Sequence, residues 1–119
     1  MRVLVCGGRN YDGPDAEAHV HDVLTRLDME SPKRFTLIIQ GGASGADACA
    51  RDWARWANLA LVTVPADWAL NKRSAGPRRN QRMIDEFKPE LVVAFPGGRG
   101  TADMVRRARA AGIQIVICK

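Results

Sequence analysis

The sequence lacks the long apolar runs and cysteine patterns of membrane and disulfide-rich proteins. Its 119 residues contain no apolar run whose length approaches the roughly 18 residues needed to cross a bilayer. The apolar run within residues 1–7 is too short for a signal peptide and precedes no Ala-x-Ala cleavage site. Cys6, Cys49 and Cys118 lie far apart and form no C-x-x-C pair. We therefore expect reduced thiols in a cytoplasmic protein with no membrane anchor.

Metal-binding and common nucleotide-binding motifs are also missing. No cluster of His, Cys and carboxylate residues has ligand spacing, and His19 and His21 fall on different faces of a predicted helix. Neither the dinucleotide-binding pattern G-x-G-x-x-G nor the P-loop pattern G-x-x-x-x-G-K-[ST] occurs. The sequence thus predicts neither a metal nor a cofactor, and it is not that of a P-loop NTPase.

The composition is that of one globular domain with a basic surface. Hydrophobic residues make up 46% and charged residues 26% of the chain. The 18 Lys and Arg residues exceed the 13 Asp and Glu residues, which gives a formal net charge of +5. This balance favours anionic partners such as phosphates, nucleotides or nucleic acid, without choosing between them.

Short apolar runs alternate with amphipathic helices along the chain. The runs are Arg2–Cys6, Phe35–Gln40, Ala60–Val64, Leu91–Phe95 and Ile113–Cys118. Helices are predicted from Pro14 onward and over residues 45–58, 78–87 and 101–111, with an irregular loop at 65–77. Runs that are apolar throughout are typical of a parallel sheet covered on both faces. The order predicts a Rossmann-like three-layer α/β/α fold with a five-stranded, mostly parallel sheet in the order 3-2-1-4-5.

Four loops with unusual residues are expected at one edge of this sheet, because strand-to-helix loops of parallel strands all leave at the carboxyl edge. Their glycines allow backbone amides to approach a phosphate, and their arginines offer paired donors to phosphate oxygens. The candidate ligand-binding residues are Gly8, Arg9, Gly41, Gly42, Ser44, Asp47, Trp68, Arg79, Asn80, Gly97, Gly98, Gly100 and Thr101. Arg99 is a further candidate cation.

Several of these residues have a second interpretation. Ser44 and Asp47 resemble a helix capping box. Asp47 would repel a phosphate, so its role at a ligand would be a hydrogen bond to a sugar hydroxyl. Trp68 either stacks on a base or packs in the protein, and Tyr11 is expected to border the base or sugar.

The motifs in these loops resemble the YspA (cpYpsA-related) branch of the SLOG superfamily. The motifs are GGASGAD at 41–47, ADW at 66–68, AGPRRNQRM at 75–83 and PGGRGT at 96–101, and they cover nearly the whole chain. The resemblance implies a Rossmann-like domain that binds a nucleotide or a nucleotide derivative, such as AMP, ADP-ribose or NAD, as a sensor or sequestering module. SLOG relatives commonly dimerise, and a homodimer or a higher homo-oligomer is expected here too, with Trp56 exposed.

The same superfamily includes the LOG phosphoribohydrolases, which suggests an alternative. LOG enzymes carry an arginine in the motif R-K-x-x-M, and Arg79 stands at that position here. They also carry a glutamate in the motif PGGxGTxxE, and this chain has Met104 in its place. Arg79 and Asp103 are therefore the catalytic candidates for cleaving an N-glycosidic bond, although Asp103 also suits a helix N-terminus without any catalytic role.

The DNA-processing protein A family in the same superfamily suggests a third function, binding of single-stranded nucleic acid. The arginines available for it lie in the predicted helices: Arg51, Arg55, Arg106, Arg107 and Arg109.

Overall fold

The sheet has the predicted strand order. The structure, a computed structural model, describes residues 1–119. The strands are β1 (Arg2–Cys6), β2 (Leu37–Gln40), β3 (Ala60–Thr63), β4 (Leu91–Ala94) and β5 (Gln114–Ile117). They form one sheet in the order β3-β2-β1-β4-β5, and every pairing is parallel. The order 3-2-1-4-5 is thus confirmed, and the sheet is parallel throughout rather than mostly parallel.

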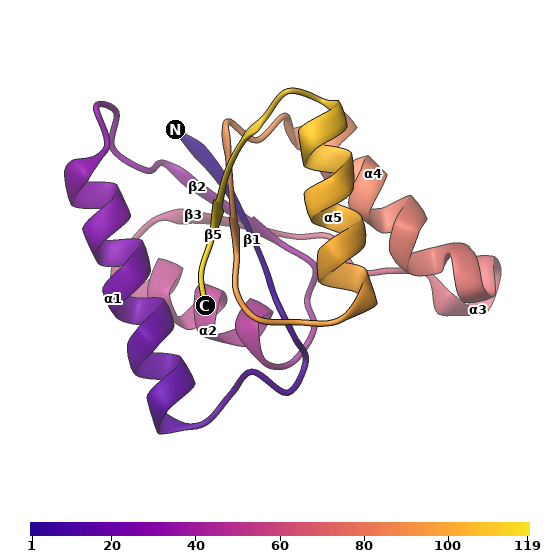
Figure 1. Cartoon of the computed structure of the whole chain (residues 1–119), viewed down its shortest axis with the longest axis horizontal. Helices are drawn as coiled ribbons and strands as arrows, with labels where there is room; N and C mark the ends of the chain where they lie inside the picture. The colour runs from indigo at the N-terminus through magenta and orange to yellow at the C-terminus, as the bar shows by residue number, and fades with distance from the viewer.

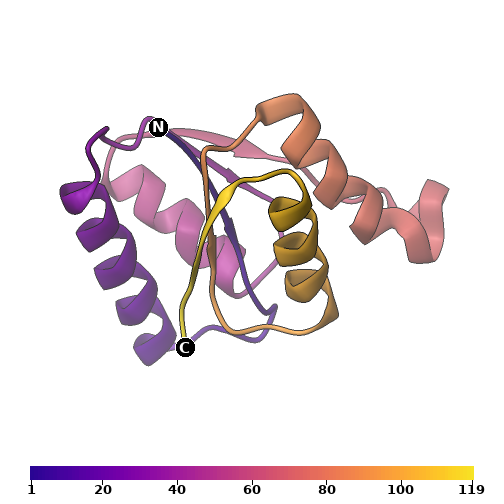
Figure 2. The same ribbon diagram turned by 45° about the horizontal axis from the view of Figure 1, so that its top comes forward.

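Helices cover both faces of this sheet. The helices are α1 (Pro14–Glu30), α2 (Ala46–Trp56), α3 (Trp68–Asn71), the 3₁₀ helix η1 (Lys72–Ser74), α4 (Ala75–Phe87) and α5 (Arg99–Ala110). Figures 1 and 2 show α1 and α2 on one side of the sheet, α4 and α5 on the other, and α3 projecting beyond the end of α4. The three-layer α/β/α architecture is therefore confirmed.

Two apolar clusters fill the spaces between these layers. Val3 in β1 packs in the cluster that contains Trp53 of α2. Leu4, the next residue, packs in the opposite cluster with Met83 of α4 and Met104 of α5. Successive residues of a strand point to opposite faces, so both faces of the central strands need apolar side chains. This requirement explains why the strand sequences do not alternate with polar residues.

The outer elements are more exposed. Each edge strand, β3 and β5, begins and ends with an exposed residue. Trp56 at the end of α2 is 65% exposed, as the sequence suggested. None of the helices combines the length and the apolar character that crossing a membrane would require.

The predicted irregular loop at 65–77 is wrong in part, because most of it is helical. The Asp67 side chain accepts a hydrogen bond from the Leu70 amide at 3.0 Å and so starts the short helix α3. The longer helix α4 begins at Ala75 rather than at Arg78. Pro77 lies in its first turn, where the missing N–H of proline leaves no hydrogen bond unmade.

The predicted capping box at the start of α2 is also wrong. The capping residue is Gly45, with φ of 74°, and no side chain caps this helix. The Ser44 hydroxyl instead donates to the Arg9 carbonyl at 3.0 Å. The amide of Ala46 donates to the Gly8 carbonyl at 3.1 Å, and the amide of Gly8 donates to the Pro96 carbonyl at 2.8 Å. The loops after β2, β1 and β4 are thereby joined at the carboxyl edge, where the strand order reverses.

Gly45 should be the least replaceable glycine of this edge. A Cβ atom at Gly45 would overlap the carbonyl oxygens of Gly8 and Arg9, and its φ is positive. We expect Gly45→Ala to lower the free energy of unfolding by about 3 kcal/mol or more, measured by urea denaturation.

Gly112→Ala is the matched control for this prediction. Gly112 has a φ of 73° but nothing within 4 Å of an added Cβ, so its replacement should cost only about 1 kcal/mol. Equal losses in the two variants would show that the joined loops do not constrain Gly45.

Candidate functional site

A cavity of about 720 Å³ opens at the carboxyl edge of the sheet. It lies between the loops after β1 and β2 and the N-terminal turns of α4 and α5. Its volume is within the range of small-molecule sites in proteins. The predicted site residues that line it are Gly8, Arg9, Gly41, Asp47, Trp68, Arg79, Asn80, Gly98, Gly100, Thr101 and Asp103.

The structure does not bring every predicted residue to this cavity. Gly42, Ser44 and Gly97 lie outside its lining. Tyr11 is also outside, because its ring stacks on Phe95 with the centroids 5.9 Å apart and its hydroxyl is hydrogen-bonded to His19 Nδ1. Tyr11 therefore does not line this cavity.

Arg79 is held in place by three hydrogen bonds. Its Nη1 donates to the carbonyls of Gly41 at 2.9 Å and Val64 at 3.3 Å, and its Nε donates to Asn80 Oδ1 at 3.1 Å. Burial lowers the pKa of Arg79, and the charge of Asp47 opposes that change. The other terminal nitrogen, Nη2, makes no hydrogen bond within the chain, so it is available to an anion in the cavity.

The turn at residues 41–43 uses its amides within the protein. The amides of Gly41 and Ala43 both donate to Asp47 Oδ2 at 3.2 Å. The amide of Gly42 donates to the Gln40 side chain at 2.7 Å. The sequence suggested that this turn offers free amides to a phosphate, but a carboxylate of the protein already occupies two of them.

The first turn of α5, unlike the turn at 41–43, has amides without a partner in the protein. The first i to i−4 bond of this helix runs from the Ala102 amide to the Gly98 carbonyl at 3.1 Å. The amides at 99–101 precede that bond, and no side chain caps the helix. Such amides carry the positive end of the helix dipole, and here they lie beside the cavity.

Arginine dominates the charge around the cavity. The cations in its lining are Arg9, Arg73, Arg79, Arg99 and Arg106. Arg9, Arg73 and Arg99 form no hydrogen bond or ion pair through their side chains; Arg9 instead lies over the Trp68 ring, 5.5 Å from its centroid. A cavity with unpaired guanidinium groups favours an anionic ligand.

Two of these arginines were missed as site residues from the sequence. Arg73 lies in the segment that was predicted to be an irregular loop. Arg106 could have been predicted from the sequence as a site residue, because Arg99, Asp103 and Arg106 follow the i, i+4, i+7 spacing of one helix face.

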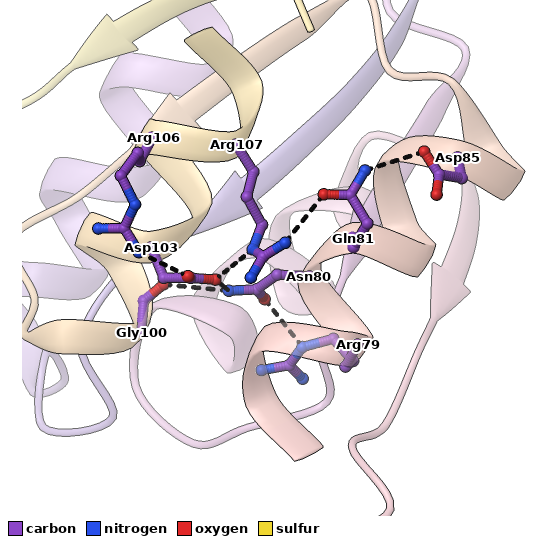
Figure 3. A network of polar contacts seen from close by, with 8 residues as sticks. All are labelled: Arg79, Asn80, Gln81, Asp85, Gly100, Asp103, Arg106 and Arg107. Atoms are coloured by element: carbon purple, nitrogen blue, oxygen red, sulfur yellow. Dashed lines mark hydrogen bonds and ion pairs between the residues drawn. The ribbon is translucent and has the colours of Figure 1, made fainter. Parts of the chain in front are cut away.

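Asp103 belongs to a polar network that joins α4 to α5 (Figure 3). Its Oδ1 accepts from Arg106 at 2.8 Å, and its Oδ2 accepts from Arg107 at 2.8 Å and from Asn80 at 2.9 Å. Asn80 is 4% exposed and also donates to the Gly100 carbonyl at 3.2 Å. Both N–H groups of the Asn80 amide are thereby used within the protein, so Asn80 positions Arg79 and α5.

The network keeps Asp103 ionised. Burial alone would raise its pKa, but hydrogen bonds from Arg107 and Asn80 and the charges of Arg107 and Arg106 outweigh burial and lower the pKa of Asp103. Met104, at the position of the LOG glutamate, is 1% exposed and lies in the apolar core. Asp103 is therefore the carboxylate that α5 presents to the cavity.

The arginines considered for nucleic-acid binding do not form one surface. Arg51 and Arg55 belong to α2, whereas Arg106, Arg107 and Arg109 belong to α5 on the opposite face of the sheet. Arg51 also donates to the Gln40 side chain at 2.9 Å and to the Ala43 carbonyl at 3.0 Å. A single strand could not contact both sets along one face.

No group of three His, Cys, Asp or Glu side chains has the arrangement of a metal site. His21 lies against the Trp56 ring with the centroids 4.5 Å apart. Cys6 lines the cavity, but burial raises the pKa of its thiol to about 12, so it is not a thiolate nucleophile near neutral pH.

Two solved structures share the fold of this chain. The crystal structure of TM1055, a structural-genomics target, superposes with a TM-score of 0.69 at 18% identity, over 97% of this chain and 72% of TM1055. The C-terminal domain of a hydrogenase from Pyrococcus furiosus superposes with a TM-score of 0.52 at 12% identity, over 98% of this chain and 90% of that domain. At such identities the likeness shows the Rossmann-like fold alone.

The sequence comparisons are more specific. Gene 61 protein of Mycobacterium phage D29 is 33% identical over 123 aligned residues, which cover 97% of this chain and 94% of the phage protein. A family model described as "YspA, cpYpsA-related SLOG family" matches residues 1–70, a range that includes the turn at 41–43 and Asp47. The fold, the loops at its carboxyl edge and these matches agree, and the chain belongs to the YspA, cpYpsA-related SLOG family.

Proposed function

We propose that the cavity binds a nucleotide or a nucleotide-derived ligand. The observation that carries this proposal is the set of three cavity arginines, Arg9, Arg73 and Arg99, that have no hydrogen-bonding or ionic partner in the chain. Arginines left unpaired around a cavity are matched by phosphate oxygens, which accept two parallel hydrogen bonds from one guanidinium group.

The phosphate end of the ligand lies at α5 in this proposal. The free amides at 99–101 and the Arg99 side chain lie at this end of α5, and Arg79, whose Nη2 makes no hydrogen bond in the chain, lines the same cavity. The positive end of a helix dipole and oriented backbone amides favour an anion at such a position. The turn at 41–43 takes no phosphate, because the Asp47 and Gln40 side chains already accept from its amides.

The base lies toward Trp68. This ring lines the cavity and is 50% exposed, so it has free surface against which a base can stack. Stacking of a base on an aromatic side chain contributes about 1–3 kcal/mol. A domain of this size with such a site suits a sensor or a sequestering module, the role that the family resemblance suggested.

Nucleotide binding should depend on the unpaired arginines. We expect isothermal titration calorimetry to detect binding of at least one among AMP, ADP-ribose, NAD and cyclic AMP. Arg99→Ala should weaken that binding about tenfold or more, since it removes a charge-assisted contact to phosphate.

Arg109→Ala is the matched control, because Arg109 is an exposed arginine of the same helix outside the cavity lining. It should bind as the wild type does. No binding of any of the four nucleotides, or equal weakening in both variants, would contradict the proposal.

Hydrolysis of an N-glycosidic bond is the second candidate function. One observation favours it: an ionised carboxylate, Asp103, lines the same cavity as Arg79. In that reaction the bond between the base and the ribose C1′ would break, the hydroxyl of water would add to C1′, and the remaining proton of the water would go to the departing base. Asp103 would stabilise the positive charge that develops on the ribose. Release of free base from AMP, measured by chromatography and abolished in Asp103→Asn, would favour hydrolysis over binding alone.

Asp103 should also stabilise the fold in a pH-dependent way. Its pKa is lowered in the folded protein, so its contribution is complete above the unfolded pKa, near 4, and disappears as the pH falls through the folded value. We expect Asp103→Asn to cost about 1–2 kcal/mol at pH 7 and progressively less below pH 4, measured by urea denaturation. Asp85→Asn, an exposed carboxylate of α4, should change little at either pH, and a cost for Asp103→Asn that did not fall in acid would contradict this role.

A further inference from the structure

Asp47 differs from Asp103 in having an unpaired oxygen. It is 6% exposed and lines the cavity. Its Oδ2 accepts from the amides of Gly41 and Ala43, whereas its Oδ1 has no hydrogen bond and no ion pair. Since no fully enclosed side-chain oxygen or nitrogen lacks a partner, Oδ1 must keep access to solvent, and the cavity provides that access.

A carboxylate oxygen in this position calls for a hydrogen-bond donor. Burial raises the pKa of Asp47, and the amides of Ala43 and Gly41 and the charge of Arg79 only partly oppose that change. A buried acceptor that stays unpaired costs free energy, so a ligand that displaces water from it must supply a donor. A phosphate cannot do so, because its oxygens and Oδ1 are both acceptors and both negatively charged.

We infer that Asp47 Oδ1 accepts a hydrogen bond from a sugar hydroxyl of the ligand, and that Asp47 thereby selects nucleotides that carry this hydroxyl over deoxy analogues that lack it. The inference rests on the proposed function and adds a requirement to it. The ligand must carry a hydroxyl donor beside its phosphate, which a ribose provides.

The neighbours of Asp47 support this class of ligand. Arg79 is close enough for its charge to act on Asp47, and both residues line the cavity. A phosphate at Arg79 and a hydroxyl at Asp47 are therefore contacts to adjacent parts of one ligand. Trp68 lines the same cavity and is half-exposed, so its ring is available to stack on the base.

The wild-type protein provides the first test, which requires no variant. Binding of AMP and ADP is compared with binding of their 2′-deoxy and 3′-deoxy analogues by calorimetry at pH 7.5. We expect at least one deoxy analogue of each nucleotide to bind about tenfold or more weakly, because it leaves a charged acceptor unpaired. Equal affinity of all three forms would overturn the inference while leaving the proposed function intact.

Asp47→Asn provides the second test with little change in shape. The amide oxygen of the substituted side chain still accepts from Gly41 and Ala43, and its NH₂ group replaces the free acceptor with a donor. A ribose hydroxyl can also accept a hydrogen bond from this NH₂ group, but that neutral bond is weaker than one to a carboxylate, so the preference for AMP over its deoxy analogues should become smaller. A variant that keeps the full discrimination would show that another group reads the hydroxyl.

Pyrophosphate binding and a second variant distinguish the loss of the Asp47 contact from a general disruption of the binding site. Pyrophosphate has no sugar hydroxyl, so Asp47→Asn should bind it as tightly as the wild type does or more tightly, since a nearby negative charge is lost. Asp52→Asn, an exposed carboxylate of the same helix, should leave every affinity unchanged. Weaker pyrophosphate binding by Asp47→Asn would overturn the inference, and failure of all nucleotides to bind the wild type would overturn the proposed function and this inference with it.

Discussion

The parallel direction of all five strands governs where the cavity of this protein lies. Parallel strands require each return connection to cross one face of the sheet, so every strand-to-helix loop leaves at the same edge. The strand order reverses between β1 and β4, which sends α1 and α2 to one face and α4 and α5 to the other. Residues as distant in sequence as Arg9, Asp47, Arg79 and Arg99 therefore line one cavity.

Within that cavity the protein treats its two carboxylates differently. Asp103 accepts hydrogen bonds from Asn80, Arg106 and Arg107 and thereby joins α4 to α5. Asp47 uses one oxygen to hold the turn at 41–43 and leaves the other toward the cavity. The surrounding arginines are similarly divided, because Arg79 and Arg106 have partners in the protein and Arg9, Arg73 and Arg99 do not. A site built in this way has a rigid wall and unsatisfied groups that a ligand can match.

The fold could be predicted from local pattern because two-sided burial leaves a strong signal. β1 and β4 are apolar at nearly every position, and α1 repeats Val20, Val23 and Leu24 at helical spacing. The errors lie where one hydrogen bond decides the conformation. Within 65–77 the Asp67 side chain caps the short helix α3, and before α2 the Ser44 hydroxyl bonds to the Arg9 carbonyl and not to an amide of the helix.

The sequence alone determined the family, the strand order and the edge at which the site would lie, since these follow from periodicity and from motifs that are contiguous in the chain. It did not determine which polar groups remain free. The amides at 41–43 and the Asn80 side chain are as suitable for a ligand as the amides at 99–101 when judged by residue type. The NH₂ group of Asn80 is occupied because folding brings the Gly100 carbonyl and the Asp103 side chain of α5 against it. The amides at 41–43 are occupied because the conformation of the turn brings the Asp47 and Gln40 side chains to them. A hydrogen-bonding group is available only when the folded chain leaves it without a partner.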